Sequence, residues 1–185
     1  MRMQVKRVKD SRTKNILVHR IADIRGGVSV SSDGLGCDYL PEGAPLAYSG
    51  GKWHVLKVGY VTEQATGTTL KVAKPHNFTV GDVVLSEVDG KAADITKIAV
   101  GSAYDIITLS AALGTIEAGA AIVEAAAKQA TSGAAVKYKA TALNGTGQPF
   151  TANTNIITDA WVIGVIKSPK FPDAAKPEGI VKLPY

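Results

Sequence analysis

The sequence contains little of what several protein classes require. A single cysteine, Cys37, stands in a chain of 185 residues, so no intrachain disulfide forms, as is usual for proteins made in a reducing cytosol. No apolar run reaches the roughly 20 residues that span a bilayer, and none follows the basic N-terminus, so we expect neither a membrane span nor a secretory signal. Aromatic residues make up only 6% of the chain, which leaves few rings for stacking on nucleic-acid bases.

Motifs that carry chemistry are also scarce. The histidines His19, His54 and His76 do not stand in H-E-x-x-H or Cys/His metal-ligand spacing. A G-x-G pattern begins at residues 34–36, but Tyr39 occupies the position of its third glycine. The phosphate-loop motif G-x-x-x-x-G-K-[ST] does not occur. We therefore expect no enzyme activity, no catalytic or metal-binding residues and no cofactor.

Basic residues are concentrated near the N-terminus. Residues 1–25 contain eight Lys or Arg and two Asp, whereas the remaining 160 residues carry 13 basic and 14 acidic side chains. The net charge of +5 therefore belongs to a basic arm attached to a nearly neutral body. Such an arm suits an acidic partner, either nucleic acid or an acidic protein surface, although a solvated terminus has the same composition. Within the arm, residues 16–24 are compatible with a short helix or a strand.

The body of the chain has a pattern typical of β-structure. From Trp53 to Glu124, short segments rich in β-branched residues recur about every ten residues, separated by turn signals such as Asp89-Gly90. This predicts an all-β fold, an antiparallel β-barrel or sandwich with at most one or two short helices, one of them a turn at 126–131. We expect three regions: a basic N-terminal arm and loop region at 1–36, a central β domain at 37–131, and a C-terminal β region at 132–185.

One segment of the C-terminal region is apolar on both faces. In the sequence WVIGVI, one face of a strand carries Trp161, Ile163 and Val165, and the other carries Val162 and Ile166. A strand of this kind is covered on both sides, either within its own chain or by a neighbouring subunit. These five residues are our candidates for the interface of a homo-oligomer.

A hairpin in the central region follows a recognisable pattern. Phe78 and Val80 alternate toward one face, where we expect them to anchor the loop in a core. Gly81-Asp82 then forms a turn, and a strand leaves over Val83–Val88. Small β-barrels of many functions share this pattern, so alone it predicts a fold and not an activity.

The hairpin belongs to a set of three motifs. They are L-P-x-G-x-P-L at 40–46, V-A-K-x-H-N-F-x-V-G-D-V-V at 72–84, and Y-D-x-I-T-L at 104–109, followed by an L-G turn. With these motifs, residues 40–122 resemble the head-fibre and capsid-decoration proteins of tailed bacteriophages. The resemblance carries no catalytic residues. No long repetitive shaft is present, which favours a short knob or a cementing protein over an extended fibre.

The resemblance implies a structural virion protein on the outside of the phage head, made in the host cytoplasm. The major capsid protein would be its partner, and a trimer is favoured over a dimer because three-fold positions recur on icosahedral heads. We expect attachment through the N-terminal region, where charge orients the arm and apolar side chains hold it. The attachment candidates are Arg2, Lys6, Arg7, Lys9, Arg12, Lys14, Ile16, Leu17, Arg20 and Ile21.

Three other functions remain open. A carbohydrate-binding β module on a virion or cell surface, with a host-surface glycan as ligand, would expose aromatic rings over a shallow groove. A nucleic-acid-binding protein would use the basic arm, although the neutral body argues against it. A hydrolase with a dispersed site is the third alternative.

Overall fold

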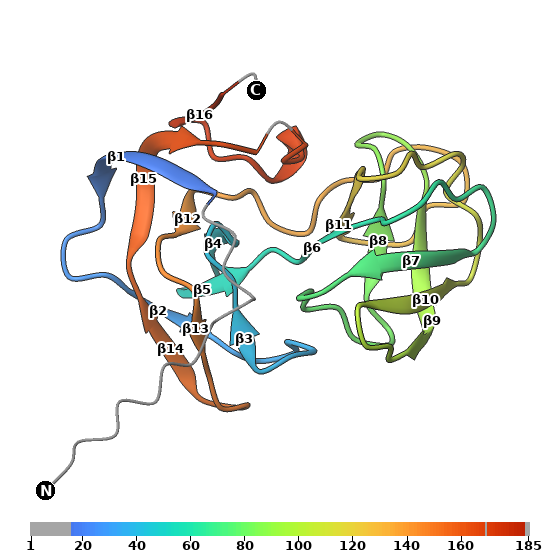
Figure 1. The fold of residues 1–185 in the computed structure, drawn as a ribbon, viewed down its shortest axis with the longest axis horizontal. Helices are drawn as coiled ribbons and strands as arrows, with labels where there is room; N and C mark the ends of the chain where they lie inside the picture. Colours follow the sequence, from blue (N-terminus) through green and yellow to red (C-terminus); the bar gives the residue numbers. More distant parts are fainter. Residues whose placement is uncertain (1–15, 169, 184–185) are drawn as a thin grey trace, which may run out of the picture.

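The chain folds into two lobes built of β-strands, and the all-β prediction is confirmed (Figure 1). The structure is a computed structural model that describes residues 16–168 and 170–183. Among these residues, the only helical element is a 3-10 turn, η1 (Asp173–Ala175). No helix in the described part of the chain has the length and apolar character needed to cross a membrane.

The first lobe, here the sheet lobe, is drawn on the left of Figure 1. An eight-stranded sheet runs in the order β1-β15-β12-β4-β5-β2-β14, with β16 added beside β15, and β3 pairs separately with β13. Its strands are β1 (Leu17–Asp23), β2 (Val28–Ser31), β3 (Tyr39–Leu40), β4 (Pro45–Ser49), β5 (Lys52–Val55), β12 (Ala142–Asn144), β13 (Gln148–Pro149), β14 (Asn155–Thr158), β15 (Ala160–Ile166) and β16 (Ile180–Lys182).

The second lobe, here the barrel lobe, contains six antiparallel strands in the order β6-β11-β8-β9-β10-β7. A bridge between Val61 and Val72 joins the two ends of this order, so the sheet closes on itself. Closure leaves no long unpaired edge on this lobe. Its strands are β6 (Val58–Tyr60), β7 (Thr69–Ala73), β8 (Val83–Leu85), β9 (Ala92–Ala99), β10 (Tyr104–Leu109) and β11 (Ala121–Glu124).

The alternation in the sequence explains these strands. Along β10, the side chains of Asp105, Ile107 and Leu109 are buried, and those between them are more exposed. A period of two is what a strand with one core face requires. The barrel core contains Leu70, Val84 and Ile122, among other apolar residues.

The barrel lobe is inserted into the sheet lobe. The chain leaves the sheet lobe after β5 and returns to it at β12, so strands from both ends of the sequence form one sheet. β1 pairs with β15, with Leu17 opposite Ile166. The sheet lobe therefore takes strands from all three regions expected from the sequence, 1–36, 37–131 and 132–185, and the two lobes do not coincide with those regions. One apolar cluster crosses the junction of the lobes and includes Leu56, Leu85, Val123, Leu143, Ile166 and Phe171.

Several local expectations are corrected. Residues 126–131 form bends and a bridge and not a helical turn, because Gln129 pairs with Ala92 through both backbone groups. Not every strand pair is antiparallel, since β15–β16 and β2–β5 are parallel. Phe78 is buried as expected, but Val80 is exposed and does not anchor the hairpin.

Candidate functional site

The exposed apolar surface of the sheet lobe lies on β1, β15 and β16. Val165 is opposite Val181 in the parallel pair, and Ile163 lies two residues before Val165 on the same face. Ile163 and Val181 are 42% and 60% exposed, so the described residues leave this face of the sheet uncovered. We call Ile163, Val165 and Val181 the outer face. A monomer gains nothing from exposing grouped aliphatic side chains, so such a patch is a candidate contact surface.

β1 adds an edge to this surface. It lies at the end of the strand order and pairs only with β15 among the described strands. Val18 and Ile21 are exposed on it, Ile21 at 63%, and Arg20 is paired with Asp23 at 3.0 Å. An unpaired edge presents backbone N–H and C=O groups to any added strand.

The attachment candidates fall into two sets. Those within the described residues are Ile16, Leu17, Arg20 and Ile21, which begin and form β1. Ile16 and Leu17 are half-buried and help to hold the strand, since the Leu17 N–H donates to Glu42 Oε1 at 3.0 Å. The candidates that lie outside the described residues are Arg2, Lys6, Arg7, Lys9, Arg12 and Lys14.

The interface candidates on β15 are divided by burial. Ile166 is fully buried in the junction core and is not available to a second subunit. Val162 packs against the core of the sheet lobe, and Trp161 is half-buried with its indole N–H directed to Asp159. Ile163 is exposed, and Val165, half-buried, lies on the same face of the strand beside the exposed Val181. The two apolar faces of the strand therefore have different uses, because one of them is covered by the chain's own core.

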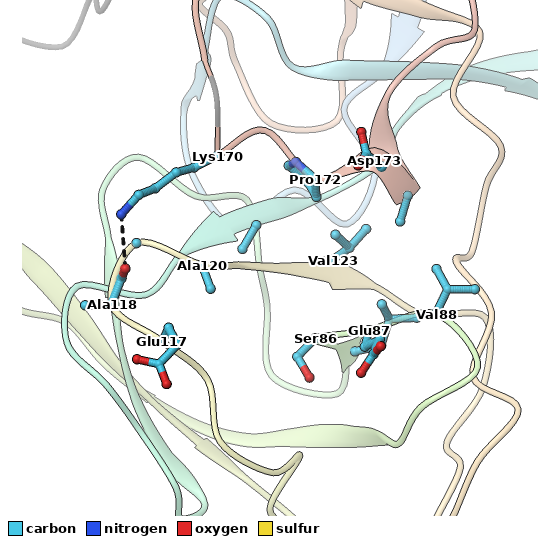
Figure 2. Close-up of a pocket in the computed structure, with 14 residues that line it drawn as sticks. Ser86, Glu87, Val88, Glu117, Ala118, Ala120, Val123, Lys170, Pro172 and Asp173 are labelled. Atoms are coloured by element: carbon cyan, nitrogen blue, oxygen red, sulfur yellow. Dashed lines mark hydrogen bonds between the residues drawn. The ribbon is translucent and has the colours of Figure 1, made fainter. Parts of the chain in front are cut away.

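A groove of about 660 Å³ separates the barrel lobe from the segment that carries η1 (Figure 2). Lys170 reaches across it and donates to the carbonyl of Ala118 at 3.1 Å. Glu117 and Asp173 lie on its two sides, on separate segments. No group of three His, Cys, Asp or Glu side chains gathers anywhere in the described residues.

The densest group of buried charges lies elsewhere, between the two lobes. Lys57 Nζ donates to Asp82 Oδ2 at 2.6 Å and to the Gly34 carbonyl at 2.6 Å. The lysine and aspartate side chains are only 5% and 11% exposed. Asp82 Oδ2 also accepts the Thr79 N–H at 2.7 Å. Lys57 thus links a loop of the sheet lobe, at Gly34, to the hairpin turn of the barrel lobe.

Glu124 completes this junction cluster, which comprises Lys57, Asp82, Glu124 and Lys137. Its side chain is 2% exposed, and Oε1 accepts from Lys137 Nζ at 2.7 Å. Burial alone would lower the pKa of Lys137, but the Glu124 carboxylate raises it above its ordinary value. Among the described residues, no hydrogen-bond donor reaches Glu124 Oε2. All four side chains line one cavity of about 100 Å³.

The hairpin motif of residues 72–84 also contributes contacts between the two lobes. The Gly36 N–H donates to the Asn77 carbonyl at 2.9 Å, and Cys37 Sγ donates to Asn77 Oδ1 at 2.9 Å. Phe78 is buried in the barrel core. The motif residues therefore hold the two lobes together, which is a structural role.

Sequence reasoning did not find the junction cluster. Lys57 and Glu124 each stand alone as a charge within an apolar strand segment, LKVGYV and AAIVEA. A lone charge in such a segment is a usable signal, because burial of an unpaired charge is costly and a partner must exist. The identity of the partner is not visible in the sequence, since Lys57 and Asp82 are brought together by β11, which pairs with β6 on one side and with β8 on the other.

Comparisons with protein-family models, with curated proteins and with solved structures find no match to this chain.

Proposed function

We propose that this chain is a structural protein of a phage virion, bound to the outside of the head as a short knob or cementing protein. The observation that carries the proposal is the exposed apolar outer face of β15 and β16 beside the edge strand β1. It supports a protein that works through contact surfaces. The phage-specific part rests on the motifs at 40–46, 72–84 and 104–109.

The N-terminal region attaches the protein to the major capsid protein. Residues 1–15 carry six basic side chains and lead directly into β1. Charge draws this segment to an acidic surface over a range of about 8 Å at physiological salt. Val18 and Ile21 then supply the apolar contact, and the edge of β1 that pairs with no other described strand accepts an added strand.

The outer face joins copies of the chain to one another. A second copy of the chain is a suitable partner for this face, because each copy contributes exposed aliphatic side chains without charge, Ile163 and Val181. Closed symmetry lets each copy bury its own patch, and three copies fit a three-fold position on an icosahedral head.

The attachment is tested with phage heads that lack their decoration. The full chain and a variant lacking residues 1–15 are mixed with these heads at low and at physiological salt, and bound protein is counted after sedimentation. This deletion spares β1, whereas removal of residues 1–25 would also remove a strand of the sheet. The matched control replaces Lys91, Lys97 and Lys128, on the barrel lobe, by Gln.

We expect the full chain and the control to bind, and the deletion variant to lose most of its binding. Failure of the full chain to bind would overturn the proposed function. Equal binding by the full chain and the deletion variant would instead place the attachment surface on the β body.

Glycan binding is a second candidate function. Tyr48 is exposed beside Trp53 on the β4–β5 hairpin, and their ring centroids are 5.5 Å apart. Paired rings on a surface are what sugar faces stack against. Binding on a glycan array that is lost in Tyr48→Ala, with unchanged binding to heads, would assign this function to the hairpin.

A further inference from the structure

We propose that Lys57 and Asp82 become joined by an amide bond between their side chains, formed within the folded protein with the help of Glu124. The two reacting groups are already in contact, with Lys57 Nζ 2.6 Å from Asp82 Oδ2. This inference is independent of the phage assignment, because it rests on the junction cluster alone.

Burial distinguishes this ion pair from the other pairs that lysine or arginine forms with a carboxylate among the described residues. The side chains of Lys57 and Asp82 are 5% and 11% exposed, whereas the partners in the Lys139–Glu178 pair are 79% and 84% exposed. An ion pair held out of water loses much of the hydration that stabilises its charges. Transfer of one proton from the ammonium to the carboxylate gives a neutral amine beside a carboxylic acid, which are the species that condense.

The strand pairing places Glu124 beside them. Val123 is opposite Val58 in the β6–β11 pair, and the Glu124 N–H donates to the Lys57 carbonyl at 2.9 Å. Residues that oppose each other in an antiparallel pair project their side chains to the same side. Glu124 and Lys57 accordingly line the same small cavity as Asp82, and Glu124 Oε2 is buried without a partner. Because Oε1 already accepts from Lys137 Nζ at 2.7 Å, Oε2 is the oxygen of Glu124 that is left to accept a proton.

The reaction balances without any external reagent. The neutral Lys57 Nζ attacks Asp82 Cγ, and the new C–N bond forms as the carbonyl π bond opens. Glu124 takes a proton from the attacking nitrogen and returns it to the departing hydroxyl, so one C–O bond breaks and one water molecule leaves. The product is a neutral secondary amide, and Glu124 ends in its starting state.

The fold supplies the rate advantage that this condensation needs. Both groups are fixed by further contacts, Lys57 by the Gly34 carbonyl and Asp82 by the Thr79 N–H. Fixing two reactants in contact replaces a bimolecular encounter by a unimolecular step. The bond formed would close the loop from residue 57 to residue 82 and fasten the base of the barrel lobe to its own hairpin turn.

The test is the intact mass of the full chain, measured after complete denaturation. We expect a mass lower by one water molecule than the mass calculated from the sequence. Fragmentation of a digest should then show the peptide with Lys57 joined to the peptide with Asp82. An unmodified mass would overturn the proposal directly, without the need for any variant.

Variants identify the atoms involved. Lys57→Arg keeps the positive charge but removes the amine, so its mass should equal the calculated one. A missing water in this variant would come from another site, such as a succinimide at Asp89-Gly90, and would count against the proposal. Lys139→Ala, at the exposed pair, should retain the loss of water.

Glu124→Gln tests the proton carrier. Its amide keeps the size of the side chain but no longer accepts a proton, so after refolding the loss of water should proceed about 100-fold more slowly. Circular dichroism confirms that the variant is folded. An unchanged rate in a folded variant would show that Glu124 has no part in the reaction.

Discussion

His76 Nε2 lies 3.1 Å from a carboxylate oxygen of Asp105, and both side chains are buried in the barrel lobe. The distance is that of an ion pair, but neither ring nitrogen of His76 has a hydrogen bond of good geometry. Burial lowers the pKa of His76 below its usual value, and the opposing attraction of Asp105 only partly offsets this effect. The folded protein therefore favours a neutral imidazole at this position.

This relationship predicts a loss of stability in mildly acidic solution. The unfolded chain takes up a proton on His76 near pH 6.5, whereas the folded chain does so only at lower pH. The stabilisation is therefore complete above pH 6.5 and is lost as the pH falls toward the folded pKa. Urea unfolding at pH 7.5 and at pH 5.5 measures the difference, and the free energy of unfolding should be lower at pH 5.5.

The matched control for the pH effect is His76→Gln, which does not titrate. Its free energy of unfolding should change less between the two pH values than that of the natural chain. Asp105 does not affect the comparison of the two pH values. Burial alone would raise the pKa of Asp105, but the Gly101 N–H, Lys74 and His76 hold this pKa below its usual value. Its contribution is lost only well below pH 5.5. Equal pH dependence in the two proteins would contradict the role given to His76.

Gly59→Ala should destabilise the barrel lobe. A Cβ at this position would lie 2.7 Å from Val72 Cγ1 and 2.8 Å from Phe78 Cε2, both in the barrel core. Overpacking of this kind costs about 1–3 kcal/mol of unfolding free energy. Gly67→Ala is the control, because a Cβ there meets nothing within 4 Å. Chemical denaturation should give free energies of unfolding that differ by that amount between the two variants. Similar denaturation midpoints would show that the core around Phe78 can accommodate an added methyl group.

Ile163→Lys should break the proposed oligomer. A charge on the outer face would be desolvated in the interface without a partner, at a cost of several kcal/mol per subunit. Ile157→Lys is the control, because Ile157 is 75% exposed on β14, away from the outer face. Light scattering should find a trimer for the natural chain and for Ile157→Lys, and a 19.2 kDa species for Ile163→Lys. A light-scattering mass of a monomer for the natural chain would refute the proposed self-association.

Local patterns in the sequence predicted the strands well, and for a physical reason. Alternation such as that of residues 104–109 has a period of two, which only a strand with one buried face satisfies. The buried position of Phe78 followed from the same rule. Val80 obeyed the rule in the sequence but not in the structure, because it is a central residue of the turn that the Asp82 N–H closes on the Thr79 carbonyl, and it is therefore exposed.

Pairing between distant segments could not be predicted in this way. Leu17 lies opposite Ile166 because two separate parts of the chain share one sheet. Neither segment contains a sequence pattern that identifies the other as its partner. The same holds for the junction cluster, where the lone charge of Lys57 in its apolar segment does not identify Asp82 as its partner. Register and insertion depend on how whole strands pack, which periodicity does not report.

The insertion of the barrel lobe also sets an order of events during synthesis. All six barrel strands lie within residues 58–124, so this lobe has every strand partner it needs before the ribosome adds residues 125–185. β1, although synthesised before the barrel lobe, has no partner until β15 is synthesised after that lobe. A nascent chain that stops short of residue 160 leaves the N-terminal strand without its partner. Synthesis of β15 is therefore what turns that strand into one edge of a finished sheet.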